Sequence, residues 1–164
     1  MTYQRSPPVP SGYNNTYHIL QSPGQVAILN EMVHDVRIVP LDGRPHVGEN
    51  VRQWNGDSRG HWENETLVVE TTHYSDKTTW RGFPGAGRTL RAVERFTRVN
   101  ADTIDYQFAI YDTTTYTRPW TVELPLTHLP SYVLYEYACH EGNYSIANVL
   151  IGARAQEKAA REAA

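Results

Sequence analysis

Short runs rich in Val, Ile, Thr and aromatic residues recur along most of the chain, and turn-forming residues separate them. Branched and aromatic side chains pack well on a pleated surface, so such runs predict β-strands. The predicted strands cover residues 16–21, 25–32, 34–40, 59–63, 66–73, 89–98, 103–112, 117–126 and 131–139. Four of the gaps have the composition of hairpin turns: Ser22-Pro-Gly24, Leu41-Asp-Gly43, Glu63-Asn-Glu65 and Asn100-Ala-Asp102. Neighbouring strands should therefore pair antiparallel.

The order of apolar residues indicates how these strands pack. Apolar and polar residues alternate over 104–110 and 120–126, which predicts one buried and one solvated face. At 164 residues, the chain has room for one sizeable core. A single sheet of so many strands would leave exposed edges, so we expect an all-β fold, an antiparallel meander barrel of the lipocalin or calycin type. A β-sandwich is the main alternative.

The two ends of the chain differ from this β region. Residues 1–12 are rich in Pro and Ser, which predicts an extended N-terminal arm. After Gly142 the apolar residues follow helical spacing, and the tail is rich in Ala, Glu, Lys and Arg. We therefore expect the barrel over residues 13–141 and a C-terminal helix over residues 142–164.

Charge and composition narrow the classes of function. The net charge is -3, whereas nucleic-acid-binding proteins usually carry an excess of basic residues. No run approaches the roughly 20 apolar residues that span a bilayer. We expect neither nucleic acid nor a membrane as a partner, and homo-oligomer formation stays open. The N-terminus has no signal-peptide pattern.

The candidate catalytic residues are ionisable groups that strand alternation places beside apolar neighbours: His34, Glu94, Glu136 and His140. His34, for example, shares one side of its predicted strand with Val36 and Ile38 and should point inward. Burial raises the pKa of a carboxyl group towards the range that suits proton transfer. An inward His or Glu is also often a hydrogen-bonded structural group, and this interpretation stays open for each residue.

Aromatic and cationic side chains supply the candidate substrate contacts. Flat rings stack on Trp and Tyr, and an Arg guanidinium holds a carboxylate through two hydrogen bonds. The candidates for substrate binding are Trp54, Arg59, His61, Trp62, Trp80, Tyr106, Trp120 and Tyr135. For residues 52–62, a purely structural role is an equal alternative to substrate binding, because Asp57 suits a turn and Arg59 suits a surface ion pair.

Taken together, these residues predict an enzyme that binds a small aromatic or polycyclic organic molecule. The expected mechanism is acid–base chemistry without a cofactor, as in an isomerase, a lyase or a hydratase. A carrier protein without turnover is one alternative. The other is a metalloenzyme with ligands from separate strands, such as His34, His61 and His140, because no two histidines have the local spacing of a metal site.

Several longer motifs carry a resemblance that extends from about Tyr13 to Glu157. They include Arg52-Gln-Trp-Asn-Gly-Asp-Ser-Arg-Gly-His-Trp-Glu63, Glu94-Arg-Phe-Thr-Arg-Val99, Thr117-Arg-Pro-Trp-Thr121 and Tyr135-Glu-Tyr-Ala-Cys-His-Glu-Gly-Asn-Tyr144. With these motifs the chain resembles a family of uncharacterised bacterial proteins, many of them exported. The resemblance implies a common architecture and an exported or periplasmic location. It implies no particular activity. Family members often have an additional N-terminal segment with a second cysteine, which implies a disulfide partner for the equivalent of Cys139.

Overall fold

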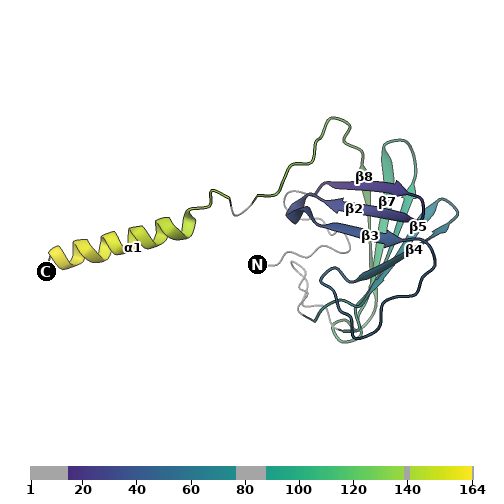
Figure 1. Ribbon diagram of the computed structural model, residues 1–164, viewed down its shortest axis with the longest axis horizontal. Coiled ribbons are helices and arrows are strands. Elements are labelled where there is room, and N and C mark those ends of the chain that lie inside the picture. The colour runs from purple at the N-terminus through teal and green to yellow at the C-terminus, as the bar shows by residue number, and fades with distance from the viewer. Residues whose placement is uncertain (1–14, 77–87, 139–140, 164) are drawn as a thin grey trace.

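The computed structural model describes residues 15–76, 88–138 and 141–163. In these residues the fold is mostly β, with one C-terminal α-helix, as the sequence predicts (Figure 1). The strands are β1 (Tyr17–Ser22), β2 (Gln25–Asn30), β3 (Val36–Pro40), β4 (Asp57–Glu63), β5 (Thr66–Thr72), β6 (Arg91–Arg98), β7 (Thr103–Tyr111) and β8 (Trp120–Thr127). The helices are the short 3-10 helix η1 (Met32–His34) and α1 (Ser145–Glu162).

The strands form two antiparallel sheets, each a simple meander. One sheet has three strands in the order β1-β2-β3, and the other has five in the order β4-β5-β6-β7-β8. Three of the four predicted hairpins join β1 to β2, β4 to β5 and β6 to β7. In the first of these, Gly24 has a φ of +77°, a left-handed conformation that glycine adopts without a steric penalty. Hence the prediction of antiparallel pairing between these sequence neighbours is confirmed. The fourth predicted hairpin is wrong, because Leu41-Asp-Gly43 lies between β3 and β4, which belong to different sheets.

The core lies between the two sheets and contains buried apolar side chains from both of them. The three-stranded sheet contributes Val26, Ile28 and Val39, all almost fully buried. The five-stranded sheet contributes larger side chains, and Tyr106 and Phe108 are at most 1% exposed. This burial on alternate positions confirms the inward face predicted for residues 104–110.

The two sheets approach each other closely where β3 passes β4. A Cβ atom at Gly60 in β4 would lie 2.7 Å from side-chain carbons of both Val39 and Leu41. No hydrogen-bonded ladder joins β3 to β4 within residues 15–76 and 88–138, so the described strands do not close into a barrel. The predicted all-β class is therefore confirmed at the level of two antiparallel sheets.

Two strand predictions are wrong. Residues 131–138 contain no strand, and most of their side chains are exposed. In β3 the faces are reversed: Val36 and Ile38 are each 47% exposed, whereas Arg37 and Val39 are buried. The ion pair of Arg37 explains the reversal, because a partnered charge can occupy an inward position that alternation alone assigns to an apolar residue.

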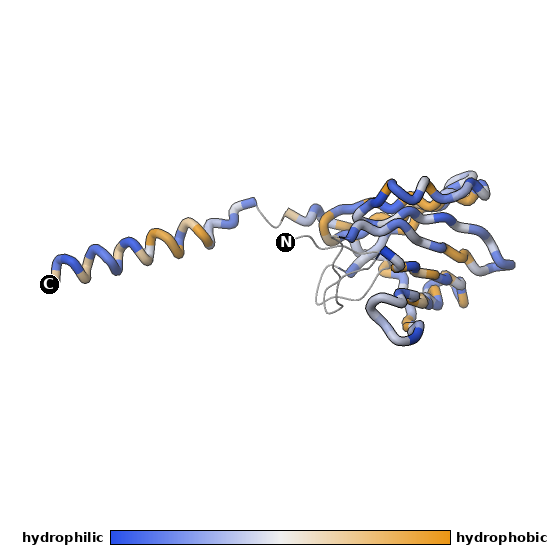
Figure 2. Tube along the Cα trace, turned by 90° about the horizontal axis from the view of Figure 1, so that it is seen from below, coloured by the Kyte–Doolittle hydropathy of each residue, from blue (hydrophilic) through white to orange (hydrophobic). Residues whose placement is uncertain are grey.

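Helix α1 extends away from both sheets (Figures 1 and 2). None of its residues is buried, and its apolar side chains are concentrated in the first half, at Ile146, Val149, Leu150 and Ile151. The helix lies within the predicted range of 142–164. The predicted arm over residues 1–12 lies outside the described residues. In the part of the chain that the structure describes, no helix has the length and hydropathy needed to cross a bilayer.

Candidate functional site

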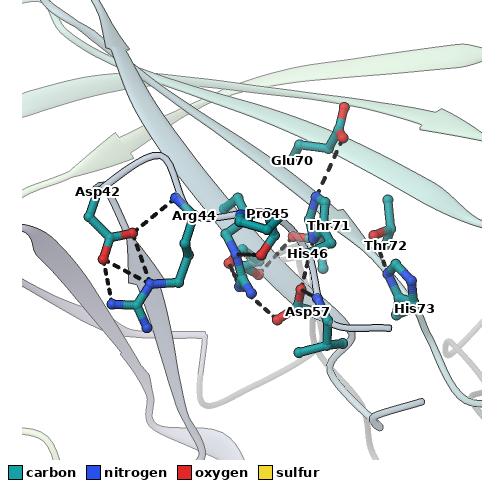
Figure 3. Close-up of polar contacts among 12 residues, drawn as sticks. Asp42, Arg44, Pro45, His46, Asp57, Glu70, Thr71, Thr72 and His73 are labelled. Atoms are coloured by element: carbon teal, nitrogen blue, oxygen red, sulfur yellow. Dashed lines mark hydrogen bonds and ion pairs between the residues drawn. The ribbon is translucent and has the colours of Figure 1, made fainter. Parts of the chain in front are cut away.

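A cluster of ionisable residues lies where the connection between β3 and β4 meets the first residue of β4 (Figure 3). Asp57 begins β4 and is only 6% exposed, and His46 lies on the preceding connection. The Nδ1 atom of His46 is 2.8 Å from Oδ2 of Asp57, and the backbone N–H of Val47 donates to the same oxygen at 3.0 Å. The carboxylate therefore fixes both the imidazole ring and the chain that carries it.

Two arginines complete a chain of alternating charge around His46. Arg59 donates to Oδ1 of Asp57 at 2.7 Å, and it also donates to the carbonyl oxygen of Pro45 at 3.0 Å. On the other side of the ring, Nε2 of His46 lies 3.5 Å from Oε1 of Glu70. Glu70 in turn accepts a hydrogen bond from Nε of Arg91 at 2.7 Å. His46 thus lies between two carboxylates, each held by its own guanidinium.

His73 brings a second imidazole to this cluster. It directly follows β5, with a φ of +54°, and its Nδ1 is 2.7 Å from the hydroxyl of Thr72. The ring centroids of His46 and His73 are 5.7 Å apart. One possible metal-ligand atom from each of His46, Asp57 and His73 lies within 4.8 Å of the other two. Three separate segments therefore converge on one small region.

The surroundings of Asp57 favour its ionised form. Burial acts to raise the pKa of this carboxyl group, but the hydrogen bonds from Val47, His46 and Arg59 outweigh burial and hold the pKa below its usual value. An ionised Asp57 at neutral pH favours the tautomer of His46 with its proton on Nδ1. The ring can then accept a proton at Nε2, which is the arrangement of a base oriented by a carboxylate.

A second ionic group lies in the core. Arg37 in β3 makes a two-pronged ion pair with Glu94 in β6, with 2.9 Å between Nη2 and Oε1. The Tyr106 hydroxyl donates to Oε1 of Glu94 at 2.9 Å. Burial would lower the pKa of Arg37, but the carboxylate of Glu94 raises it above its usual value. Burial and Glu94 together raise the pKa of Tyr106 well above its usual value.

This core group joins the two sheets, and its geometry is that of a structural element. Glu94 points inward, as the sequence predicts, and it is fully buried. Its carboxylate accepts hydrogen bonds from Arg37 and Tyr106, which is the arrangement that the structural alternative describes for an inward Glu.

The other predicted catalytic residues do not converge with Glu94. His34 is exposed at the end of helix η1, so the prediction that it points inward is wrong. The turn there has positive φ angles at Val33 and His34, which take the chain out of the strand alternation. Glu136 is exposed, on a segment without strand structure. His140 lies outside the described residues.

Few of the predicted substrate contacts lie near one another. Trp54, Trp62 and Tyr135 are between 46% and 70% exposed. His61 is also exposed, and its Nε2 is 3.2 Å from a carboxylate oxygen of Glu63. Trp120 packs against the core, where its ring meets Phe108 edge-on, and Trp80 lies outside the described residues. Of the predicted contacts, Arg59 alone belongs to the described cluster around His46.

Sequence reasoning missed His46 and His73 as site residues. Both lie outside the regular strands, so neither strand alternation nor local spacing could find them. The available signal was the dense polar run that contains Asp57 and Arg59, for which the sequence left two interpretations open, a source of substrate contacts or a turn with a surface ion pair. No family model, curated protein or solved structure matches this chain.

Proposed function

We propose that the chain is an acid–base enzyme for a small, aromatic organic molecule, and that His46 moves the proton. The observation that carries this proposal is the 2.8 Å contact between Nδ1 of His46 and the ionised, buried Asp57. A carboxylate in this position fixes the tautomer and the orientation of the imidazole, as a general base requires. The expected reaction types are isomerisation, elimination and hydration, and none of these steps needs a cofactor.

The surroundings of His46 support a site that a small molecule can reach. The side chain of His46 is 23% exposed, so part of the ring is open to solvent while Asp57 stays covered. Glu70 lies on the other side of the ring, with 3.5 Å between its Oε1 and Nε2 of His46. Arg91 holds Glu70 and itself stacks over the ring of Tyr111, with 4.8 Å to the ring centroid, so its guanidinium is fixed from two sides.

The closed lipocalin-like barrel is also part of the proposal. The close approach of Gly60 to Val39 and Leu41 supports it, because β3 and β4 are the strands that would have to pair for the sheet to continue. Backbone NMR contacts between β3 and β4 and between β8 and β1 would support the barrel, because both pairs must be hydrogen-bonded for the sheet to close. Their absence, with the ladders of both sheets intact, would favour two separate sheets.

Proton abstraction can be tested before the natural substrate is known. The protein is incubated in D2O with a panel of small aromatic carbonyl compounds, and NMR follows deuterium uptake at carbon. We expect wild-type protein to accelerate uptake in at least one compound, and His46→Ala to lower the rate about 100-fold or more. A well-matched control is His128→Ala, which removes an exposed histidine that also faces a carboxylate, with 3.3 Å between Nδ1 and Oδ1 of Asp102.

The outcomes of this experiment separate the candidate functions. Loss of uptake in His46→Ala with full uptake in His128→Ala would support the proposal. Binding of a compound without uptake would indicate a carrier protein and overturn the enzymatic role. Equal deuterium uptake by the wild type and by His46→Ala would show that His46 does not move the proton.

A further inference from the structure

We propose that His46, Asp57 and His73 form a binding site for a divalent transition-metal ion. Their possible ligand atoms all lie within 4.8 Å of one another, although the residues come from three different parts of the chain. Asp57 is buried and both histidines are half-buried, so the group is shielded from bulk water. This inference goes beyond the proposed proton transfer, which does not use His73.

The chemistry of the ligand atoms selects the kind of ion. Two imidazole nitrogens and one carboxylate oxygen suit Zn²⁺, Fe²⁺, Co²⁺ or Ni²⁺. Mg²⁺ and Ca²⁺ prefer oxygen ligands throughout and should bind weakly here. Three protein ligands also leave a coordination position for water or for a ligand, which is the usual arrangement of a site that is more than structural.

Neighbouring groups already hold the ligands in place. The Thr72 hydroxyl is 2.7 Å from Nδ1 of His73, and this contact orients the ring. Arg59 occupies Oδ1 of Asp57, so Oδ2 faces His46. Such outer contacts normally accompany metal ligands, and their loss weakens metal binding about 10- to 100-fold.

Two features oppose a cation at this position and limit its affinity. Arg59 places a positive charge 2.7 Å from Oδ1 of Asp57. In addition, a metal ion that binds both Nδ1 of His46 and Oδ2 of Asp57 would replace the hydrogen bond between them. A bound metal would therefore compete with the proton transfer proposed above, because both use His46. We expect Zn²⁺ to inhibit deuterium uptake when the site is filled.

The test is a metal titration that needs no enzymatic activity. The full chain, purified without an affinity tag and stripped with a chelator, is titrated with ZnCl₂ by calorimetry, and with CoCl₂ by visible absorption. We expect one ion per chain and a ligand-field spectrum typical of nitrogen and oxygen ligands. MgCl₂ in the same calorimeter should give no comparable heat.

Variants decide whether the ion binds at the proposed residues. His73→Asn removes the imidazole, and Asn tolerates the positive φ of +54° at this position, so the backbone should be preserved. We expect His73→Asn to weaken Zn²⁺ binding at least tenfold. His61→Ala is a matched control, because it removes an exposed histidine that pairs with a single carboxylate, Glu63.

Each result of the titration bears on the inference. Binding that is lost in His73→Asn and kept in His61→Ala would support it, provided that circular dichroism shows both variants folded. No binding to wild-type protein would overturn it, and so would equal affinity in wild type and His73→Asn. Deuterium uptake by metal-free protein tests the proton transfer separately, so the failure of one proposal is distinguishable from the failure of the other.

Discussion

At the scale of single residues, the buried ion pair between Arg37 and Glu94 links the two sheets. Glu94 is fully buried and Arg37 is 9% exposed, so each charge depends on the other for compensation. Removing one member of such a pair leaves an uncompensated charge in the core, which typically costs more than the pair itself contributes. Tyr106 adds a hydrogen bond that also depends on the carboxylate of Glu94.

We expect Glu94→Gln to lower the free energy of unfolding by about 3–5 kcal/mol, because it leaves Arg37 charged and without a carboxylate. Chemical denaturation monitored by Trp fluorescence measures this change. The double variant Arg37→Met with Glu94→Leu should recover much of the loss, since an apolar pair carries no buried charge. A loss below about 1 kcal/mol in Glu94→Gln would contradict the structural role of this pair.

Asp57 predicts a defined pH dependence of stability. Its pKa is lower in the folded chain than the value of about 3.9 in an unfolded chain. The ionised carboxylate therefore stabilises the folded state at pH values above the unfolded pKa, and this contribution is lost as the pH falls through the folded pKa. Unfolding measured from pH 7 to pH 3 should show the largest difference between wild type and Asp57→Asn at the upper end.

In that series, the difference between wild type and Asp57→Asn should begin to shrink below about pH 4, where Asp57 of the unfolded chain takes up its proton, and it should be lost as the pH falls through the lower pKa of folded Asp57. Asp102→Asn provides the control, because Asp102 is exposed and its contact to His128 is long, at 3.3 Å. A difference that stays constant over the whole pH range would mean that the charge of Asp57 does not stabilise the fold.

At the scale of elements, the close passage of β3 over β4 depends on Gly60. A Cβ atom there would approach side-chain carbons of Val39 and Leu41 to 2.7 Å, so these side chains or the backbone that carries them would have to shift. We expect Gly60→Ala to destabilise the fold by about 1–3 kcal/mol, as overpacked cores do. Gly48→Ala is the control, because a Cβ atom at Gly48 meets nothing within 4 Å. The midpoint of urea unfolding compares the two variants, and equal midpoints would contradict the close approach.

A comparison of the predicted strands with the observed ones shows what a sequence pattern can predict. Strands β5, β6 and β7 were predicted within a few residues, since each has an apolar face and a hairpin or a loop rich in turn formers at its ends. Residues 131–139 have the same β-forming composition, yet 131–138 form no strand. Composition describes a local preference, whereas a strand also needs a neighbour that can satisfy its backbone hydrogen bonds.

At the scale of the whole molecule, no residue of α1 is buried, so the helix adds nothing to the hydrophobic core. All of its residues are exposed or partly exposed, and it extends away from both sheets (Figure 1). We expect a chain that ends at residue 144 to keep the unfolding midpoint of the full chain, within about 0.5 kcal/mol of unfolding free energy. Urea denaturation followed by Trp fluorescence measures this, since α1 contains no Trp. A marked loss of stability would show that α1 contacts the sheets in solution.

The sequence by itself determined the mostly β class, the antiparallel hairpins within each sheet and the C-terminal helix, because hairpin turns and periodicity act over a few residues. It also placed Glu94 on an inward face, since strand alternation is local. Only the tertiary structure decided that Arg37 compensates Glu94, and that His46 and His73 meet at Asp57. These contacts join segments that are distant in sequence, and their geometry depends on how two sheets and their connections pack together.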